Sequence, residues 1–206
     1  MTGEFLALDA IVETPRGSRN KYEFDVASAS IRLDRVLFSS VHYPGDYGFV
    51  VGTRCGDGDA LDVLILVEEP TFPGCRVRVR PIGVLLTEDE GGDDEKILAV
   101  PQGDPRFAGV NDLSDLPHHW LTEVENFFAT YKALEGKSAT TGKWKGAKEA
   151  CLAVARRWRA EELEDKPEIS TDPRSGYREQ AHANMDVLSF GGDFASQKGG
   201  GDGSGA

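Results

Sequence analysis

The chain has 206 residues, and its 35 acidic side chains against 23 basic ones give a formal net charge of -12 with histidine neutral. That length suffices for one domain with its own core, and a hydrophobic fraction of 39% is too high for a wholly disordered chain. Because nucleic-acid binders need a basic face and no lysine or arginine cluster dominates here, the charge argues against a nucleic-acid partner.

The first hundred residues are typical of short strands separated by turns. Four segments carry β-branched runs between glycine, proline and aspartate clusters, namely residues 47–53, 61–67, 76–86 and 97–101. From Arg76 to Arg80 arginine and valine alternate strictly, which favours a strand with one solvent-exposed face. Several short strands at this spacing predict a small barrel or sandwich.

Two helices are predicted after these strands. Ser114 or Asp115 can cap a helix that has Pro117 in its first turn. The apolar side chains of this helix form one stripe, which consists of Trp120, Val124, Phe127, Phe128, Tyr131 and Leu134. A second helix is predicted over residues 147–163. Its inward face is predicted to hold Cys151, Val154, Ala155 and Trp158.

Beyond about residue 166 the apolar periodicity fades. The last ten residues, QKGGGDGSGA, have the composition of a flexible linker. We therefore expect one domain over residues 1–165 and a glycine-rich, disordered C-terminal tail over residues 166–206.

The beginning of the chain and its cysteines bear on the cellular compartment. The first residues, MTGEFLALDA, lack the basic region and the long apolar run of a secretory signal. No stretch approaches the roughly 20 apolar residues that span a bilayer. The three cysteines lie far apart and form no Cys-x-x-Cys pair, which disfavours a zinc knuckle and a disulfide framework. We expect a cytoplasmic protein with reduced cysteines and no membrane partner.

The sharpest local signal is the hexapeptide Asp57-Gly58-Asp59-Ala60-Leu61-Asp62, which places three carboxylates directly before an apolar strand. Such crowding is costly unless cations neutralise it. In an extended chain Asp57 and Asp59 point the same way, and the glycine between them lets the loop bend so that Asp62 can join them. Hard oxygen ligands of this kind suit Mg²⁺ or Ca²⁺. From the hexapeptide alone, a solvated acidic turn is the alternative.

An EF-hand loop would be the obvious competitor for these acids. Counting Asp57 as position 1 puts Glu68 at position 12. Position 5 is nevertheless the apolar Leu61, and position 6 is Asp62 where the loop needs glycine. A strand also follows where an EF-hand has a helix, so we exclude this motif.

A second acidic segment, residues 88–95, follows the predicted strand that ends near residue 86. By itself it is typical of a charged hairpin tip. Because neighbouring metal ions need bridging acids from more than one segment, two carboxylate-rich strand ends in one small barrel favour a multi-metal site. The basic residues that could join such a site are scattered along the chain, at Lys21, Arg35, Lys96 and Lys132. Taken singly, each is typical of an ordinary surface residue.

Several further segments accompany the hexapeptide in a fixed order. They are Val12-Glu13-Thr14-Pro15, Arg19-Asn20-Lys21-Tyr22-Glu23, Leu33-Asp34-Arg35, Tyr43-Pro44-Gly45-Asp46-Tyr47-Gly48, residues 89–96 and Phe127-Phe128-Ala129-Thr130-Tyr131-Lys132. Read together, they resemble the family I (soluble) inorganic pyrophosphatases, and most of all the short bacterial type. The resemblance spans about residues 5–160. The hexapeptide matches the family motif Asp-x-Asp-Pro-x-Asp except for Ala60, whose proline counterpart supplies no ligand atom.

The resemblance implies an α+β, mainly β fold, in which an OB-like five-stranded β-barrel is flanked by two α-helices and the site lies in the barrel mouth. It implies an inorganic diphosphatase, a phosphoanhydride hydrolase of phosphate metabolism. The implied reaction is Mg²⁺-dependent hydrolysis of pyrophosphate to two orthophosphates by direct attack of a metal-activated water, with no covalent intermediate. It also implies a homohexamer.

By the same resemblance, each site residue has an expected role. Asp59 is the expected general base. The expected metal ligands are Asp57, Asp62, Asp89 and Asp94, with Glu13 and Glu23 supporting further metal or its water. The residues expected to bind the phosphates are Lys21, Arg35, Tyr43, Tyr47, Lys96, Tyr131 and Lys132, all of them except Tyr43 also expected to act in catalysis.

Two other functions use part of the same pattern. An acidic metal-binding module without catalysis would use the carboxylates but would need neither Arg35 nor Lys132. A phosphohydrolase for nucleotides or longer polyphosphates would need an aromatic or apolar pocket for a base.

Overall fold

The computed structural model describes residues 6–56, 58–89, 92–137 and 140–158, except for the side chains of residues 88, 89, 92, 93 and 140. The predicted tail over residues 166–206 lies outside the described residues. The strands are β1 (Leu8–Thr14), β2 (Asn20–Asp25), β3 (Ser30–Val36), β4 (Asp46–Val50), β5 (Asp62–Ile65), β6 (Arg76–Asp89), β7 (Gly92–Pro101) and β8 (Thr140–Gly146). The α-helices are α1 (His118–Thr130) and α2 (Ala147–Arg157), and short 3-10 turns are η1 (Pro105–Phe107), η2 (Leu113–Asp115) and η3 (Ala133–Glu135).

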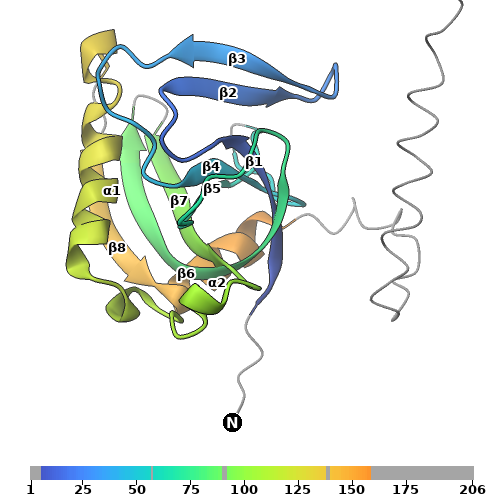
Figure 1. Ribbon diagram of the computed structural model, residues 1–206, viewed down its shortest axis with the longest axis vertical. Helices are drawn as coiled ribbons and strands as arrows, with labels where there is room; N and C mark the ends of the chain where they lie inside the picture. Colours follow the sequence, from blue (N-terminus) through green and yellow to red (C-terminus); the bar gives the residue numbers. More distant parts are fainter. Residues whose placement is uncertain (1–5, 57, 90–91, 138–139, 159–206) are drawn as a thin grey trace, which may run out of the picture. The chain divides into compact units, whose positions relative to one another are not determined.

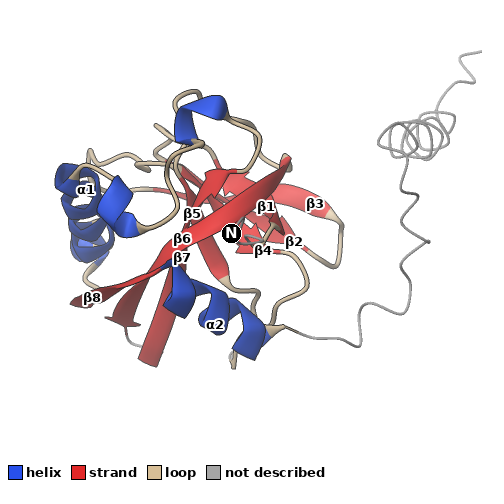
Figure 2. Cartoon of the chain, turned by 90° about the horizontal axis from the view of Figure 1, so that it is seen from below, coloured by secondary structure: helices blue, strands red, loops and turns tan. Residues whose placement is uncertain are grey.

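Five strands close into a ring. They follow one another in the order β1-β4-β5-β7-β6, and β6 pairs back with β1, while β8 extends the sheet from β6 (Figure 1). The β5–β7 pair is parallel and the other pairs of the ring are antiparallel. β2 and β3 form a separate two-stranded sheet. This architecture, with α1 and α2 against different sides of the strands, confirms the expected OB-like barrel flanked by two helices (Figure 2).

β5 is buried on both faces at Val63, Leu64 and Ile65, which explains the apolar run over residues 63–67. Alternate residues of β5 enter two different cores, since Val63 and Ile65 belong to one cluster and Leu64 to the other. The first cluster is completed by the small α2 residues Ala150 and Ala153, together with Val154. The second cluster is completed by α1, and it is the one that supports the candidate site.

The boundaries of α1 differ from the prediction. α1 starts at His118 with Pro117 at its N-cap, so neither Ser114 nor Asp115 caps it. Both residues belong to η2 instead, where the Asp115 carboxylate accepts bonds from the backbone N–H groups of residues 111 and 112. The predicted stripe is buried at Val124, Phe127, Phe128 and Tyr131, but Leu134 lies beyond α1 and is 67% exposed.

The inward face of α2 also differs from the prediction. Ala150, Ala153 and Val154 are buried, whereas Ala155 is exposed and Cys151 is only half-buried. The helix ends at Arg157 rather than at residue 163, and the next residue pairs with Thr53 in an isolated β-bridge. The buried face is thus shifted by about one residue from the predicted one, and its small alanines permit close packing of the helix on the sheet. Across the described ranges, neither helix is long and apolar enough to cross a membrane.

Candidate active site

The site is organised by the only parallel strand pair of the described sheet. β5 and β7 pair with Val63 opposite Ile97, so the preceding residues Asp62 and Lys96 lie side by side on one face. Asp94 is two residues before Lys96 and shares that face. The Lys96 Nζ lies 2.8 Å from Asp62 Oδ2 and 2.8 Å from Asp94 Oδ2. The register of one strand pair thus gathers two expected metal ligands around one ammonium group.

Tyr47 joins this group from β4. It pairs with Leu64, which lies on the same face of β5 as Asp62. Its hydroxyl donates a hydrogen bond to Asp62 Oδ2 and accepts one from Lys96 Nζ at 3.3 Å. Burial raises the pKa of the Tyr47 phenol well above its ordinary value, and the Asp62 carboxylate raises it further. Tyr47 is therefore a neutral donor at physiological pH.

Lys96 keeps its charge although it is 6% exposed. Burial alone would lower the pKa of its ammonium group, but Asp62 and Asp94 outweigh burial, and the pKa is above the ordinary value. The ammonium also lies 5.1 Å from the ring centroid of Phe128 on α1. A charged lysine is thus held in a largely water-free place.

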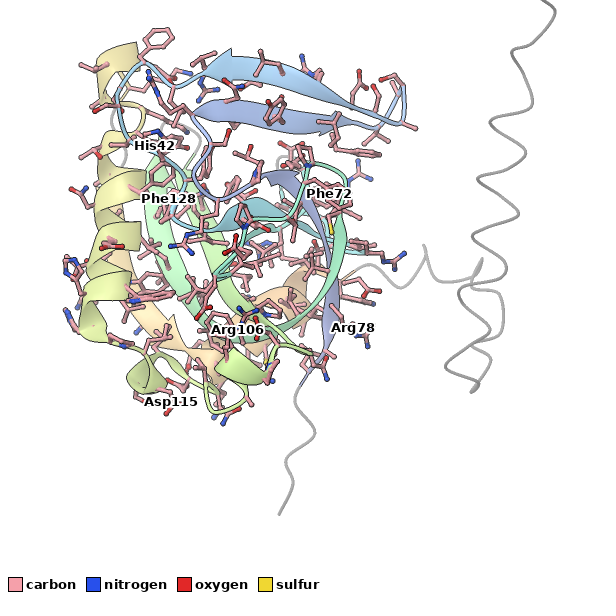
Figure 3. The ribbon with its side chains drawn as sticks, in the orientation of Figure 1. His42, Phe72, Arg78, Arg106, Asp115 and Phe128 are labelled. Atoms are coloured by element: carbon pink, nitrogen blue, oxygen red, sulfur yellow. The ribbon has the colours of Figure 1, made fainter. Side chains whose placement is uncertain are left out.

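Aromatic side chains fix the position of the tyrosines. The Tyr43 and Tyr47 ring centroids are 5.3 Å apart, and Tyr43 lies 4.7 Å from Phe127. At the end of α1, Tyr131 stacks on Phe127 with centroids 5.0 Å apart. Figure 3 shows Phe128 between α1 and the strands of the ring. Three expected phosphate-binding tyrosines therefore belong to one packed cluster.

A β-bulge in the β2–β3 hairpin positions a second group of charged side chains. In the β2–β3 hairpin Lys21 pairs with Arg35 and Tyr22 pairs with Leu33, which leaves Asp34 as the extra residue. A bulge of this kind lets two consecutive side chains turn to the same side. Asp34 Oδ2 consequently lies 3.3 Å from Lys21 Nζ and 2.6 Å from Arg35 Nη1. Burial opposes ionisation of Asp34, but Lys21 and Arg35 outweigh it and hold the pKa below its usual range.

Glu23 is also held by cations of the hairpin. Its Oε1 lies 2.6 Å from Lys21 Nζ, and its Oε2 lies 2.9 Å from Arg32 Nη2. Lys21 therefore links Glu23 to Asp34, and the hairpin presents an alternating chain of acids and bases.

Glu13 lies at a second bulge and connects the β2–β3 hairpin with Asp62. In the β1–β4 pairing Val12 is opposite Gly48 and Thr14 is opposite Tyr47, so Glu13 is the extra residue. The Phe24 backbone N–H of β2 donates to Glu13 Oε1 at 2.8 Å. Burial raises the pKa of Glu13 to about 7 against the opposing Phe24 bond, and the Asp62 carboxylate adds to the rise.

Most expected site residues are therefore brought together. Those joined by the contacts and electrostatic interactions above are Glu13, Lys21, Glu23, Arg35, Tyr43, Tyr47, Asp62, Asp94, Lys96 and Tyr131. Those within one residue of a strand end, as expected for a site in the barrel mouth, are Glu13, Lys21, Arg35, Tyr47 and Asp62. Lys132 is the second residue after α1, and its Nζ lies 5.4 Å from the Tyr131 ring centroid.

Three further expected residues are Asp57, Asp59 and Asp89. Asp57 and the side chain of Asp89 lie outside the described residues. Asp59 is exposed in the loop before β5, where its backbone carbonyl accepts a bond from Cys55 N at 2.6 Å.

The described donors fit a hard divalent cation. They are carboxylate oxygens, and the Asp62 carboxylate raises the pKa of Glu13, which indicates negative charge that a cation would relieve. Without Asp57 and the Asp89 side chain, the described part of the chain contains no group of three acidic, histidine or cysteine side chains placed to hold a metal.

Two acidic contacts were missed by the sequence reasoning. Asp34 lies inside the quoted segment with Arg35, but the bulge that turns it toward Lys21 depends on strand pairing. Glu135 pairs with Arg35 Nε at 2.9 Å across 100 residues of sequence. In the sequence, only the position of Glu135 shortly after Tyr131 and Lys132 indicated that it could lie near the site.

The comparisons with known proteins decide the family. The sequence profile described as inorganic pyrophosphatase matches residues 10–161 of this chain. The chain belongs to the inorganic pyrophosphatase family. It is 51% identical over 145 residues to the inorganic pyrophosphatase of Leifsonia xyli subsp. xyli, which covers 70% of this chain and 89% of that one. It is 49% identical over 147 residues to that of Halalkalibacterium halodurans, with 71% and 90% covered.

Solved pyrophosphatase structures share the fold. The inorganic pyrophosphatase from Thermus thermophilus superposes with a TM-score of 0.71 and 42% sequence identity, covering 75% of this chain and 90% of that one. The resemblance to bacterial family I pyrophosphatases, the OB-like fold and the hydrolase class are therefore confirmed. Membership of the pyrophosphatase family also implies a divalent metal cofactor.

Proposed function

We propose that this pyrophosphatase-family enzyme uses Mg²⁺ to hydrolyse inorganic pyrophosphate to two orthophosphates by direct attack of water, without a covalent intermediate. Family membership supplies the reaction, whereas the metal and the residue roles are our proposal. The observation that supports them best is the buried Lys96 ammonium, 2.8 Å from each of Asp62 and Asp94. Such a group suits a site for both cations and phosphate oxygens.

The barrier to this reaction is largely electrostatic, because water must attack phosphorus through a shell of negative oxygens. When bound, Mg²⁺ neutralises phosphate charge and lowers the pKa of the attacking water. The residues that would hold it are Asp57, Asp62, Asp89 and Asp94, with Glu13 and Glu23 in support.

The chain's own cations and phenols stabilise the phosphates. Arg35 binds phosphate oxygens as a planar fork, and Lys21, Lys96 and Lys132 act as point charges. Tyr43 and Tyr47 donate hydrogen bonds as neutral phenols, because burial holds the pKa of each well above its ordinary value. Tyr131 lies in the same aromatic cluster and completes the phosphate-binding set.

Asp59 accepts the proton of the attacking water. Its exposure and its place three residues before Asp62 suit a carboxylate that must stay ionised and reach a water molecule. No side chain forms a bond to phosphorus in this scheme.

The assembly and location are also proposals. By family resemblance the enzyme is a homohexamer, and its acidic charge and reduced cysteines suit the cytoplasm, with neither nucleic acid nor membrane as partner. The pyrophosphatase domain covers residues 1–165 and is followed by the tail over residues 166–206. Sedimentation analysis tests the hexamer.

Orthophosphate release from pyrophosphate, with Mg²⁺ and with the metal chelated, tests the function. We expect release only with Mg²⁺ and much slower release from ATP. An acidic metal-binding module would release none, and a nucleotide hydrolase would prefer ATP. Either result would refute the proposal.

A further inference from the structure

Glu135 is a buried acid that contacts a phosphate-binding residue from a distant part of the chain. It is the last residue of η3, directly after the turn that carries Tyr131 and Lys132. Its side chain is 8% exposed, and its Oε1 accepts a hydrogen bond from Arg35 Nε at 2.9 Å. Glu135 has no role in the function proposed above.

The backbone around Glu135 is held by its own turn. The Glu135 N–H donates to Lys132 O at 2.9 Å, and Gly136 then ends the turn in the left-handed region with φ of 74°. The position of the Glu135 carboxylate is therefore linked to that of Lys132. A movement of the end of α1 would move both residues.

The Arg35 guanidinium is held along two of its edges. Nε donates to Glu135 on one side, and Nη1 donates to Asp34 Oδ2 at 2.6 Å on the other. Two contacts at different nitrogens fix the plane of a guanidinium, which a single contact does not. They use two of the five N–H donors that the group offers.

The pKa of Arg35 also reflects its contact with Glu135. Burial would lower the pKa of Arg35, but the bond and charge of Glu135 lead the opposing effects and raise it. Asp34 and Tyr131 also act on Arg35, so the guanidinium lies within electrostatic reach of the α1 end.

The Arg35–Glu135 pair joins two parts of the fold that carry different phosphate-binding residues. Arg35 lies in the β2–β3 hairpin, which forms a sheet separate from the ring. Tyr131 and Lys132 lie at the end of α1, on the same segment as Glu135. An arginine side chain held at one position loses less rotamer freedom when it binds phosphate.

We propose that Glu135 is a positioning residue for pyrophosphate: its carboxylate orients the Arg35 guanidinium toward the phosphate group that Tyr131 and Lys132 also bind. This inference rests on the proposed function, which assigns those three residues to phosphate. Glu135 itself touches no substrate. Its effect on binding passes entirely through Arg35.

A double-mutant cycle with Arg35 tests this role. We expect Glu135→Ala to raise KM for magnesium pyrophosphate about tenfold with a smaller change in kcat, and Glu135→Gln to raise it about threefold because the amide oxygen still accepts from Nε. In an Arg35→Ala background, Glu135→Ala should change KM less than about twofold. Equal factors in both backgrounds, or an unchanged KM in Glu135→Ala, would overturn the proposal.

Binding without turnover gives an independent measurement. The Kd of imidodiphosphate with Mg²⁺, measured by calorimetry, should follow the same pattern across the four proteins of the cycle. If Glu135→Ala does not fold, Glu135→Gln carries the cycle, because it keeps the size and the acceptor of the side chain. An unchanged Kd in Glu135→Gln would then refute the role of the charge.

Glu68→Gln is a matched control. Glu68 Oε2 forms an ion pair with Arg106 Nη1 at the same distance of 2.9 Å, on an exposed part of the surface. This variant changes the net charge equally and should leave KM and Kd unchanged. If the wild-type enzyme releases no orthophosphate, the proposed function fails. If it releases orthophosphate but the effects of the Glu135 and Arg35 substitutions are additive, only the role of Glu135 is refuted.

Discussion

Asp62 on β5 and Lys96 on β7 lie side by side in the parallel strand pair, with 2.8 Å between Asp62 Oδ2 and Lys96 Nζ. Neither side chain could reach the other if the β5–β7 register moved by one residue, because one of the two would then face the opposite core. The packing of the two hydrophobic clusters therefore also fixes the distance between these two charged side chains.

Lys96→Met tests the importance of that ammonium group. The substitution leaves the Asp62 and Asp94 carboxylates facing each other without a cation. We expect kcat to fall at least about 100-fold, as for the loss of a buried electrostatic donor. The metal-free protein should lose about 1 to 3 kcal/mol in urea unfolding, a moderate cost because the carboxylates are 31% and 34% exposed.

Lys145→Met, at an exposed position of β8, controls for the loss of one positive charge. It should retain wild-type kcat and stability. Wild-type turnover in Lys96→Met would show that this lysine lies outside the catalytic machinery.

Glu13→Gln tests how much the ionised, buried Glu13 carboxylate lowers the stability of the metal-free protein. The pKa of Glu13 is raised from 4.5 to about 7, so the folded state holds this proton more tightly than the unfolded state. The stability of the wild-type protein should therefore fall as pH rises from 4.5 to 7, by about 3 kcal/mol from this group. Glutamine cannot ionise, yet its Oε1 still accepts from the Phe24 N–H.

We expect Glu13→Gln to match the wild type near pH 4 and to exceed its stability by about 3 kcal/mol at pH 8. Urea unfolding with the metal chelated, repeated across this range, measures the difference. Glu69→Gln, at an exposed position, should show no such gain. A difference that does not vary with pH would contradict the assignment.

The central strands and α1 could be predicted because their signals are local. Most of β5 lies in a continuous apolar run, β6 begins with alternating arginine and valine, and α1 carries a stripe at helical spacing. β1, the β2–β3 hairpin and β8 were not predicted individually. β1 alternates buried residues with polar ones such as Asp9 and Glu13, and β8 contains two glycines and two lysines.

The site could be predicted as a set of residues but not as an arrangement. Family resemblance gave the identities of the acids and bases, and no local pattern shows that Glu13 and Asp34 sit at β-bulges. Register depends on which strands pair and on turn geometry, so it is a property of the whole fold. The contact between Arg35 and Glu135, 100 residues apart, is the plainest example.

Gly48→Ala tests the close approach of β1 and β4 beside the site. A Cβ at Gly48 would lie 1.9 Å from Ile11 O, a backbone atom that cannot move without shifting β1. We expect a loss of at least about 3 kcal/mol in urea unfolding, with lower activity because Tyr47 and Glu13 flank this contact. Gly109→Ala, where a Cβ meets nothing within 4 Å, should change stability by less than about 0.5 kcal/mol. Equal stabilities of the two variants would show that β1 and β4 do not approach so closely.

Asp59→Asn separates catalysis from folding. Asp59 is exposed, so the amide should leave stability within about 0.5 kcal/mol of the wild type. Asparagine cannot accept a proton from the attacking water, and we expect kcat to fall about 100-fold or more. The Kd of imidodiphosphate should change little, because Asp59 acts on water rather than on phosphate. Near-normal turnover with intact binding would assign the base to another group, and among the neighbouring acids Glu13 is the one whose pKa, about 7, suits that role.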